Sequence, residues 1–186
     1  LQHFDSDLAS PELATFNVEL NNTPRPLHGQ VFEPFREEMS DLLERAQDTA
    51  SELDAQLLLT GILPTAKPEH FGTEHMSDMN RYRVLNEQVL EARDHRPLHF
   101  EIDGREPLEL LDDSVMLEAA TTSFQLHLQT PWQDAHHYYN AALLASAPCV
   151  AIAANAPLFF GHLLWEETRI PVFEQGRSRS HPPSRL

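Results

Sequence analysis

Two segments of alternating apolar and polar residues constrain the fold of this chain more than any other feature. In Thr15–Asn21 and again in Ala120–Gln129, the even-numbered positions carry the mainly apolar side chains. Successive side chains of a β-strand point to opposite faces, so each segment predicts a strand with one buried face and one polar face. The polar faces would hold short or medium-length donors and acceptors: Asn17, Glu19, Asn21, Gln125, His127 and Gln129.

These polar faces differ from the Lys, Glu, Arg and Thr of an ordinary solvated strand. A carboxylate such as Glu19 and an imidazole such as His127 can share a divalent cation. A solvated face with incidental polar residues is the other interpretation of the same pattern, and the pattern alone favours it.

The remaining periodicity predicts a mixture of helices and short strands. Apolar residues at three- and four-residue steps predict helices over Phe35–Gln56 and from Ser77 or Asp78 to about Ala92. The apolar run Leu57–Leu63 predicts a buried strand, and residues 98–110 predict a small hairpin around Asp103-Gly104.

A third helix is expected to open at Pro131 and to lead into Ala141–Phe160, the one long uncharged stretch. Its length is that of a membrane span, but it is rich in alanine and contains Pro148, Asn155 and Pro157. We therefore expect a buried helix followed by a loop, and no membrane partner. Cys149 lies in this stretch and is expected to be an inert core thiol.

Charge and length limit the class of protein. With 13 basic and 29 acidic residues, the net charge of −16 disfavours nucleic-acid binding, which needs a cationic face. The single cysteine excludes an internal disulfide framework and fits a reducing, cytoplasmic compartment. The 186 residues suit one domain, over 1–175, with a flexible tail over 176–186. We also expect a fragment, since the chain lacks an initiator methionine and its first strand signal comes almost at once. Residues 1–13 are polar and acidic and do not resemble a signal peptide.

Five segments, in order along the chain, resemble motifs of the glutamate–cysteine ligase type 2 family. Val18–Asn21 is similar to its VELNT strand, Thr60–Pro64 (TGILP) to GTHPF, and Asn80–Tyr82 to an Arg-Tyr pair. Ser123–Gln129 (SFQLHLQ) is similar to its histidine strand, GMHVHVG. In the last segment, Pro148–Arg169, Ala154–Pro157 stands where the family has Ala-Asn-Ser-Pro. The chain departs from the family at Gln125, which replaces the first histidine. It also lacks counterparts of the Gly-x-Glu-x-Glu opening strand and of the late catalytic strand.

The resemblance implies an α+β fold, namely part of a glutamine synthetase-like catalytic domain. Such a domain has a curved antiparallel sheet with helices packed on its outer face and the site on its concave face. Members join a carboxylate to an amine with ATP and Mg²⁺ or Mn²⁺, through an acyl-phosphate. The partner would be a small-molecule amino acid or amine. An acidic protein can bind ATP when metal ions supply the positive charge.

The resemblance also assigns roles to particular residues. Glu19 and His127 would hold the metal, and Arg169 would be the catalytic residue that meets phosphate or a substrate carboxylate. The expected ATP- or substrate-binding residues are Gln125, Gln129, Asn155 and Arg81. For Arg169 an ion pair with Glu166 or Glu167 is an equal alternative; Asn155 could simply end a helix, and Arg81 could be structural.

Two other functions stay open. The first is a non-catalytic or inactive ligand-binding domain on the same scaffold, which the missing carboxylate motif and Gln125 favour. The second is a metal-dependent hydrolase, supported only by His70, His75 and His127, whose spacing matches no metalloprotease motif. The sequence leaves the amine substrate and the oligomeric state open, including a homo-oligomer.

Overall fold

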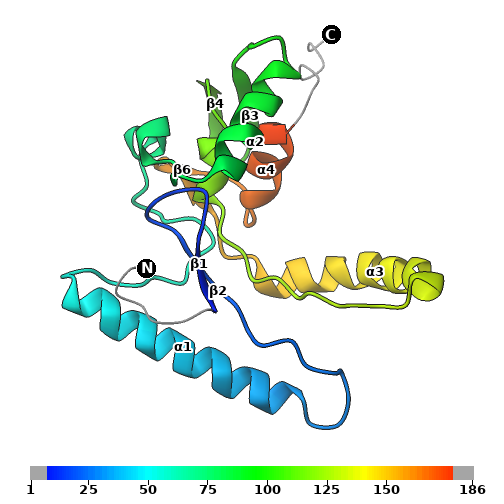
Figure 1. Cartoon of the computed structure of the whole chain (residues 1–186). Helices are drawn as coiled ribbons and strands as arrows, with labels where there is room; N and C mark the ends of the chain where they lie inside the picture. The colour runs from blue at the N-terminus through cyan, green and yellow to red at the C-terminus, as the bar shows by residue number, and fades with distance from the viewer. Residues whose placement is uncertain (1–7, 178–186) are drawn as a thin grey trace.

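The structure is a computed structural model, and it describes residues 8–177 (Figure 1). Over these residues it combines four α-helices with short antiparallel strands and 3₁₀ turns, which confirms the α+β class. The strands pair as three separate two-stranded sheets within this range, rather than as the single curved sheet that the family resemblance implied.

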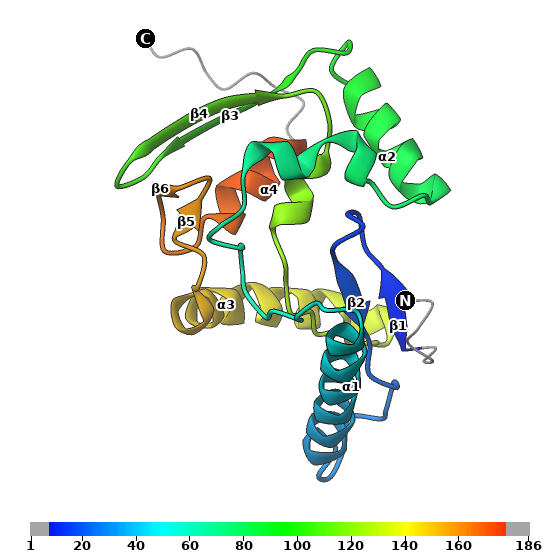
Figure 2. The same cartoon turned by 90° about the vertical axis from the view of Figure 1, so that its left-hand side faces the viewer.

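The N-terminal part pairs a short hairpin with a long helix. Strand β1 (Ala9–Pro11) is antiparallel to β2 (Val18–Leu20), with Ser10 opposite Glu19. The strand expected over Thr15–Asn21 is therefore confirmed only over Val18–Leu20. Helix α1 (Phe32–Glu52) confirms the first predicted helix, begins three residues earlier than expected, and extends away from the rest of the molecule (Figure 2).

The core lies under the second hairpin. Strands β3 (Leu98–Asp103) and β4 (Pro107–Asp112) confirm the predicted hairpin, and Leu98, Phe100 and Ile102 point into the core at 0–1% exposure. Helix α4 (Arg169–Arg177) packs on β3. There the Glu101 N–H donates to Gln175 Oε1 at 2.8 Å, and Gln175 Nε2 donates to the Glu101 carbonyl at 2.9 Å.

Around this core, short turns replace some of the expected structure. Helix α2 (Asn80–Glu91) confirms the second predicted helix, without a side-chain cap from Ser77 or Asp78. The preceding loop contains the 3₁₀ turns η1 (Pro68–Phe71) and η2 (Thr73–His75). The buried strand expected over Leu57–Leu63 is wrong, because these residues form no strand, and only Gly61 and Ile62 among them are buried while Leu58 and Leu59 face solvent.

The strand expected over Ala120–Gln129 is also wrong. Ala120 ends the buried 3₁₀ turn η3 (Met116–Ala120), and residues 121–131 form no regular structure. A strand needs a neighbouring strand for its backbone hydrogen bonds. The alternating pattern specifies two faces but not that neighbour, and here the intended inner face, with Phe124 and Leu126, is exposed.

The third predicted helix is present but exposed. After η4 (Trp132–Asp134), helix α3 (Ala135–Ala153) continues through Pro148 and has no buried residue. The expectations of a buried helix and of a core thiol at Cys149 are therefore wrong, since Cys149 is exposed. Over the described residues, no helix is long and apolar enough to cross a membrane.

The chain after α3 returns to the core. A small hairpin of β5 (Leu158–Phe159) and β6 (His162–Leu163) leads to α4, and Phe159 is fully buried. Helix α4 takes in Gly176 and Arg177, so those two residues belong to the folded part rather than to the expected tail. The rest of that tail, 178–186, lies outside the described residues.

Candidate functional site

Four segments that are distant in sequence meet around Gly61. Its carbonyl accepts the Thr122 backbone N–H at 3.0 Å. A Cβ at Gly61 would overlap the side-chain oxygen of Asn155 and lie 3.1 Å from Ala156 Cβ and 3.2 Å from Arg169 Nε. A side chain at position 61 would therefore displace the Asn155 side chain and crowd Ala156 and Arg169, and glycine allows this close approach. We call Gly61, Thr122, Asn155, Glu167 and Arg169 the Gly61 cluster.

Backbone hydrogen bonds hold the segment that contains Asn155 beside the segment that contains Glu167 and Arg169. The Ala156 N–H donates to the Glu166 carbonyl at 3.1 Å, and the Thr168 N–H donates to the Ala156 carbonyl at 3.1 Å. This short parallel bridge between Ala156 and Glu167 places the exposed Asn155 next to the start of α4. Asn155 therefore both follows the end of α3 and lies in the cluster.

Arg169 forms the strongest polar contacts of the cluster. Its Nε and Nη2 donate to the two carboxylate oxygens of Glu167, each at 2.5 Å, and Nη1 donates to the Thr122 carbonyl at 2.7 Å. The side chains are 23% and 10% exposed. Hydrogen bonds from Arg169 lower the pKa of Glu167 despite its partial burial, and the carboxylate raises the pKa of Arg169.

This geometry decides what Arg169 has left to offer a ligand. A guanidinium has five N–H donors, and three of them bond to Glu167 and Thr122. Two N–H donors remain, one on each terminal nitrogen. The ion pair with Glu167 that the sequence left as an alternative is therefore present, and the same guanidinium can still meet one anionic group.

The expected metal ligands lie on different elements. Glu19, on β2, accepts a hydrogen bond from the Ser10 hydroxyl at 2.9 Å. His127 lies in the exposed segment 121–131, with Nε2 3.1 Å from Gln125 Oε1. Nowhere in residues 8–177 do three or more His, Cys, Asp or Glu side chains gather as a metal would require. The metal role of Glu19 and His127 stays a prediction, and the same finding leaves the hydrolase interpretation without support.

The other expected binding residues lie outside the Gly61 cluster. Arg81 donates from Nη2 to the Pro11 carbonyl at 2.9 Å and lies over the Tyr82 ring, 4.5 Å from its centroid. These contacts tie α2 to β1, as the structural alternative for Arg81 predicts. Gln129 is exposed in segment 121–131 together with Gln125.

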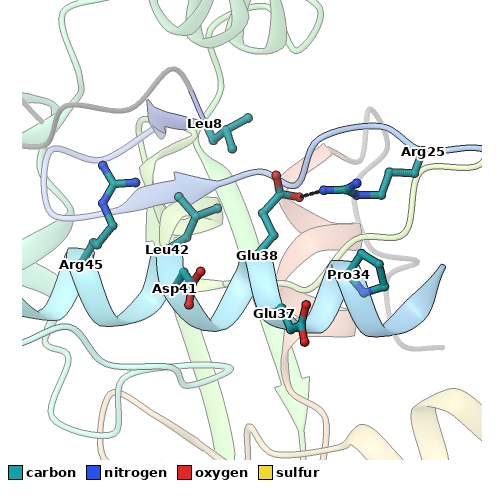
Figure 3. A pocket seen from close by; sticks show the side chains of 8 residues that line it. All are labelled: Leu8, Arg25, Pro34, Glu37, Glu38, Asp41, Leu42 and Arg45. Carbon is teal, nitrogen blue, oxygen red and sulfur yellow. Dashed lines mark ion pairs between the residues drawn. The ribbon is translucent and has the colours of Figure 1, made fainter. Parts of the chain in front are cut away.

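A separate hollow of about 370 Å³ lies between α1 and the N-terminal segment (Figure 3). Glu38 dominates it: the Thr23 N–H and hydroxyl and the Asn22 amide donate to its carboxylate at 2.6–3.0 Å, and these bonds lower its pKa. Arg25 adds an ion pair at 3.7 Å. Glu38 thus binds the loop after β2 to α1. None of the site residues expected from the sequence lines this hollow.

Sequence reasoning missed three members of the Gly61 cluster as functional candidates: Gly61, Thr122 and Glu167. A signal was present for each, because Gly61 stands in the TGILP motif, Thr122 immediately precedes SFQLHLQ, and Glu167 stands two residues before Arg169. What the motifs could not supply is the spatial meeting of these segments, which depends on the close approach at Gly61.

Comparison with known proteins identifies the family. A family model described as glutamate-cysteine ligase family 2 matches residues 1–185, and the chain belongs to this family. Membership of this family indicates a ligase-type enzyme that joins carboxylates to amines. The resemblance of the chain to this family is thereby confirmed. No curated protein and no solved structure matches the chain.

Proposed function

We propose that this protein is an ATP-dependent carboxylate–amine ligase similar to glutamate–cysteine ligase, forming an amide through an acyl-phosphate with Mg²⁺ or Mn²⁺. The observation that carries the proposal is the meeting of Gly61, Asn155 and Arg169, because each comes from a segment that resembles a family motif. Family membership over residues 1–185 supports the general class of the reaction.

Arg169 would bind an anionic group of the substrates. Its two remaining N–H donors suit a phosphate or carboxylate oxygen, and charge-assisted bonds of this kind are stronger than neutral ones. Glu167 and the Thr122 carbonyl fix the plane of the guanidinium before any ligand arrives. Asn155, beside it, would orient the substrate through its amide.

The metal site is proposed only in outline. Mg²⁺ or Mn²⁺ would neutralise the triphosphate of ATP. Glu19 and His127 are the candidate ligands, but within residues 8–177 they do not belong to a complete donor set. We therefore assign no reaction step to a metal held by these residues alone.

Activity of the full-length gene product tests the proposal. ADP release is measured with Mg-ATP, glutamate and small amines, and calorimetry measures Mg-ATP binding. We expect Arg169→Met to lower kcat/KM by about 100-fold or more, the effect of losing one well-placed donor to a developing charge. The matched control is Arg105→Met, since Arg105 also pairs with a glutamate, Glu166, at 2.6 Å but in an exposed position. Neither binding nor ADP release in the unaltered protein would refute the ligase proposal.

A non-catalytic ligand-binding domain is the second candidate. Gln125 in place of a histidine favours it, as does the absence of a gathered donor set among the described residues. This candidate predicts calorimetric binding of ATP or glutamate that Arg169→Met weakens, without ADP release under any substrate combination. If the unaltered protein releases ADP faster than the Arg169→Met protein does, the protein is an enzyme rather than a binding domain.

A further inference from the structure

The closed end of the β3–β4 hairpin packs against the segment that leads into α4. Residues 103–106, which we call the hairpin turn, lie beside residues 163–166 (Figure 2). A Cβ at Gly104 would lie 2.5 Å from Leu164 Cα and 2.8 Å from the Leu164 carbonyl carbon. A side chain does not approach a backbone so closely, so glycine allows this contact. Leu164 itself is buried and belongs to the core.

Hydrogen bonds fasten the hairpin turn to the same segment. The Glu106 N–H donates to the Leu163 carbonyl at 2.8 Å, and the Leu163 N–H donates to Glu106 Oε2 at 2.6 Å. The indole Nε1 of Trp165 donates to the Asp103 carbonyl at 3.0 Å. These bonds hold the segment before Glu167 from one side.

The residues after α3 hold this segment from its other side. The Leu164 N–H donates to the Pro157 carbonyl at 2.9 Å. Thr168, which stands between the two members of the ion pair, is fully buried, and its hydroxyl donates to the Trp165 carbonyl at 3.0 Å. Because the segment is bonded on both sides, a displacement of Leu164 is passed on to Glu167, three residues further along the chain.

We propose that the hairpin turn is a positioning element: through Gly104 and Trp165 it sets the place of the Arg169 guanidinium in the Gly61 cluster. The inference rests on the proposed function for the role of Arg169 in binding an anion. Glu167 conveys the position, because its backbone follows residues 163–166 and its two carboxylate oxygens accept hydrogen bonds from Arg169, each at 2.5 Å.

The contact at Gly104 gives the size of the expected displacement. Ordinary contact with a Cβ begins at 3.4 Å, so Gly104→Ala needs a shift of about 1 Å between the hairpin turn and Leu164. If Leu164 moves, the segment before Glu167 moves with it. If the hairpin turn moves instead, its hydrogen bonds to Leu163 and Trp165 break. In either case the segment loses its fixed position, and a misplacement of about 1 Å at a reacting group can lower the rate about 100-fold.

The ion pair between Arg105 and Glu166 is a separate contact of the hairpin turn. Its side chains are 67% and 70% exposed, so the pair contributes little to holding the segment. The positioning therefore depends on backbone contacts and on the Trp165 indole. Arg105→Met consequently remains a control for the site.

The side chain of Arg169 in the ligand-free protein tests the positioning directly. Its Nε–H gives an NMR signal, identified by its absence in Arg169→Met, whose chemical shift and exchange with water report the bond to Glu167. Glu167→Gln provides the signal of a guanidinium without this ion pair. We expect Gly104→Ala, and to a smaller extent Trp165→Phe, to move the signal towards that of Glu167→Gln and to make its exchange faster.

Binding and turnover give a second measurement. Calorimetry with the full-length gene product should show the Mg-ATP dissociation constant raised by about tenfold in Gly104→Ala, as for the loss of one hydrogen bond to a charged group. We expect kcat/KM to fall by about 100-fold. If the Arg169 signal moves but the unaltered protein neither binds Mg-ATP nor releases ADP, the ligase proposal fails while the positioning of the ion pair stands.

Gly72→Ala is the matched control, because it makes the same substitution in another loop. Gly72 has an ordinary φ of −68°, and the atoms nearest to a Cβ there belong to the exposed side chain of Glu74, which can move away. It should leave the Arg169 signal and Mg-ATP binding unchanged.

Three results would overturn the proposal. The first is a Gly104→Ala protein that loses stability in urea but keeps the Arg169 signal and the Mg-ATP affinity, since this is the result of a purely structural contact. The second is an equal change in Gly72→Ala. If Gly104→Ala does not fold, Trp165→Phe replaces it, because it keeps an aromatic ring and removes the indole N–H; an unchanged Arg169 signal in that protein is the third.

Discussion

At the scale of single residues, Glu167 and Arg169 prepare a binding group before a ligand is present. They are two residues apart at the start of α4, so their ion pair forms locally, whereas the bond from Arg169 to the Thr122 carbonyl reaches 47 residues back along the chain. A guanidinium held at three of its N–H groups has lost its rotamer freedom during folding. Binding an anion then costs less conformational entropy than it would for a free arginine.

The Glu167–Arg169 pair predicts a specific dependence of stability on pH. The pKa of Glu167 lies below its ordinary value of 4.5, mainly because Arg169 donates hydrogen bonds to it. The stabilisation is therefore complete above pH 4.5 and is lost as the pH falls through the lowered pKa. We expect Glu167→Gln to reduce the free energy of unfolding at neutral pH by about 1.5–3 kcal/mol, and to remove this part of its acid dependence.

Urea denaturation at a series of pH values measures how the free energy of unfolding of the unaltered and Glu167→Gln proteins depends on pH. Glu166→Gln is the control, because Glu166 is 70% exposed and its pair with Arg105 should contribute little to stability. If the stability of the Glu167→Gln and unaltered proteins fell equally at low pH, the Glu167–Arg169 pair would not be the cause of this acid dependence.

At the scale of elements, two segments with the same alternating pattern fold differently. Leu98–Asp103 finds β4 beside it and buries Phe100 completely, whereas Ala120–Gln129 has no partner strand among residues 8–177 and leaves Phe124 77% exposed. The hairpin could be predicted because a turn at Asp103-Gly104 brings its two strands together locally. The partner of Ala120–Gln129 would have to come from elsewhere, and periodicity carries no information about it.

These two segments predict opposite results for the same substitution. Phe100→Ala should reduce the free energy of unfolding by about 3–5 kcal/mol, since it leaves a cavity in the core. Phe124→Ala should change the stability of the monomer by less than about 0.5 kcal/mol, because its ring is exposed. Urea denaturation at low protein concentration measures both, and a large loss for Phe124→Ala would mean that segment 121–131 packs on the monomer after all.

At the scale of the whole molecule, the sequence predicted the family and most helices, but not how the motifs meet. Helices α1 and α2 follow from local periodicity, and Arg169 and Asn155 follow from motifs. The Gly61 cluster depends on contacts between segments far apart in the chain, as does the burial of any helix. For this reason the polar role of Arg169 and its ion pair with a neighbouring glutamate could be anticipated, whereas its bond to the Thr122 carbonyl and the exposed state of α3 could not.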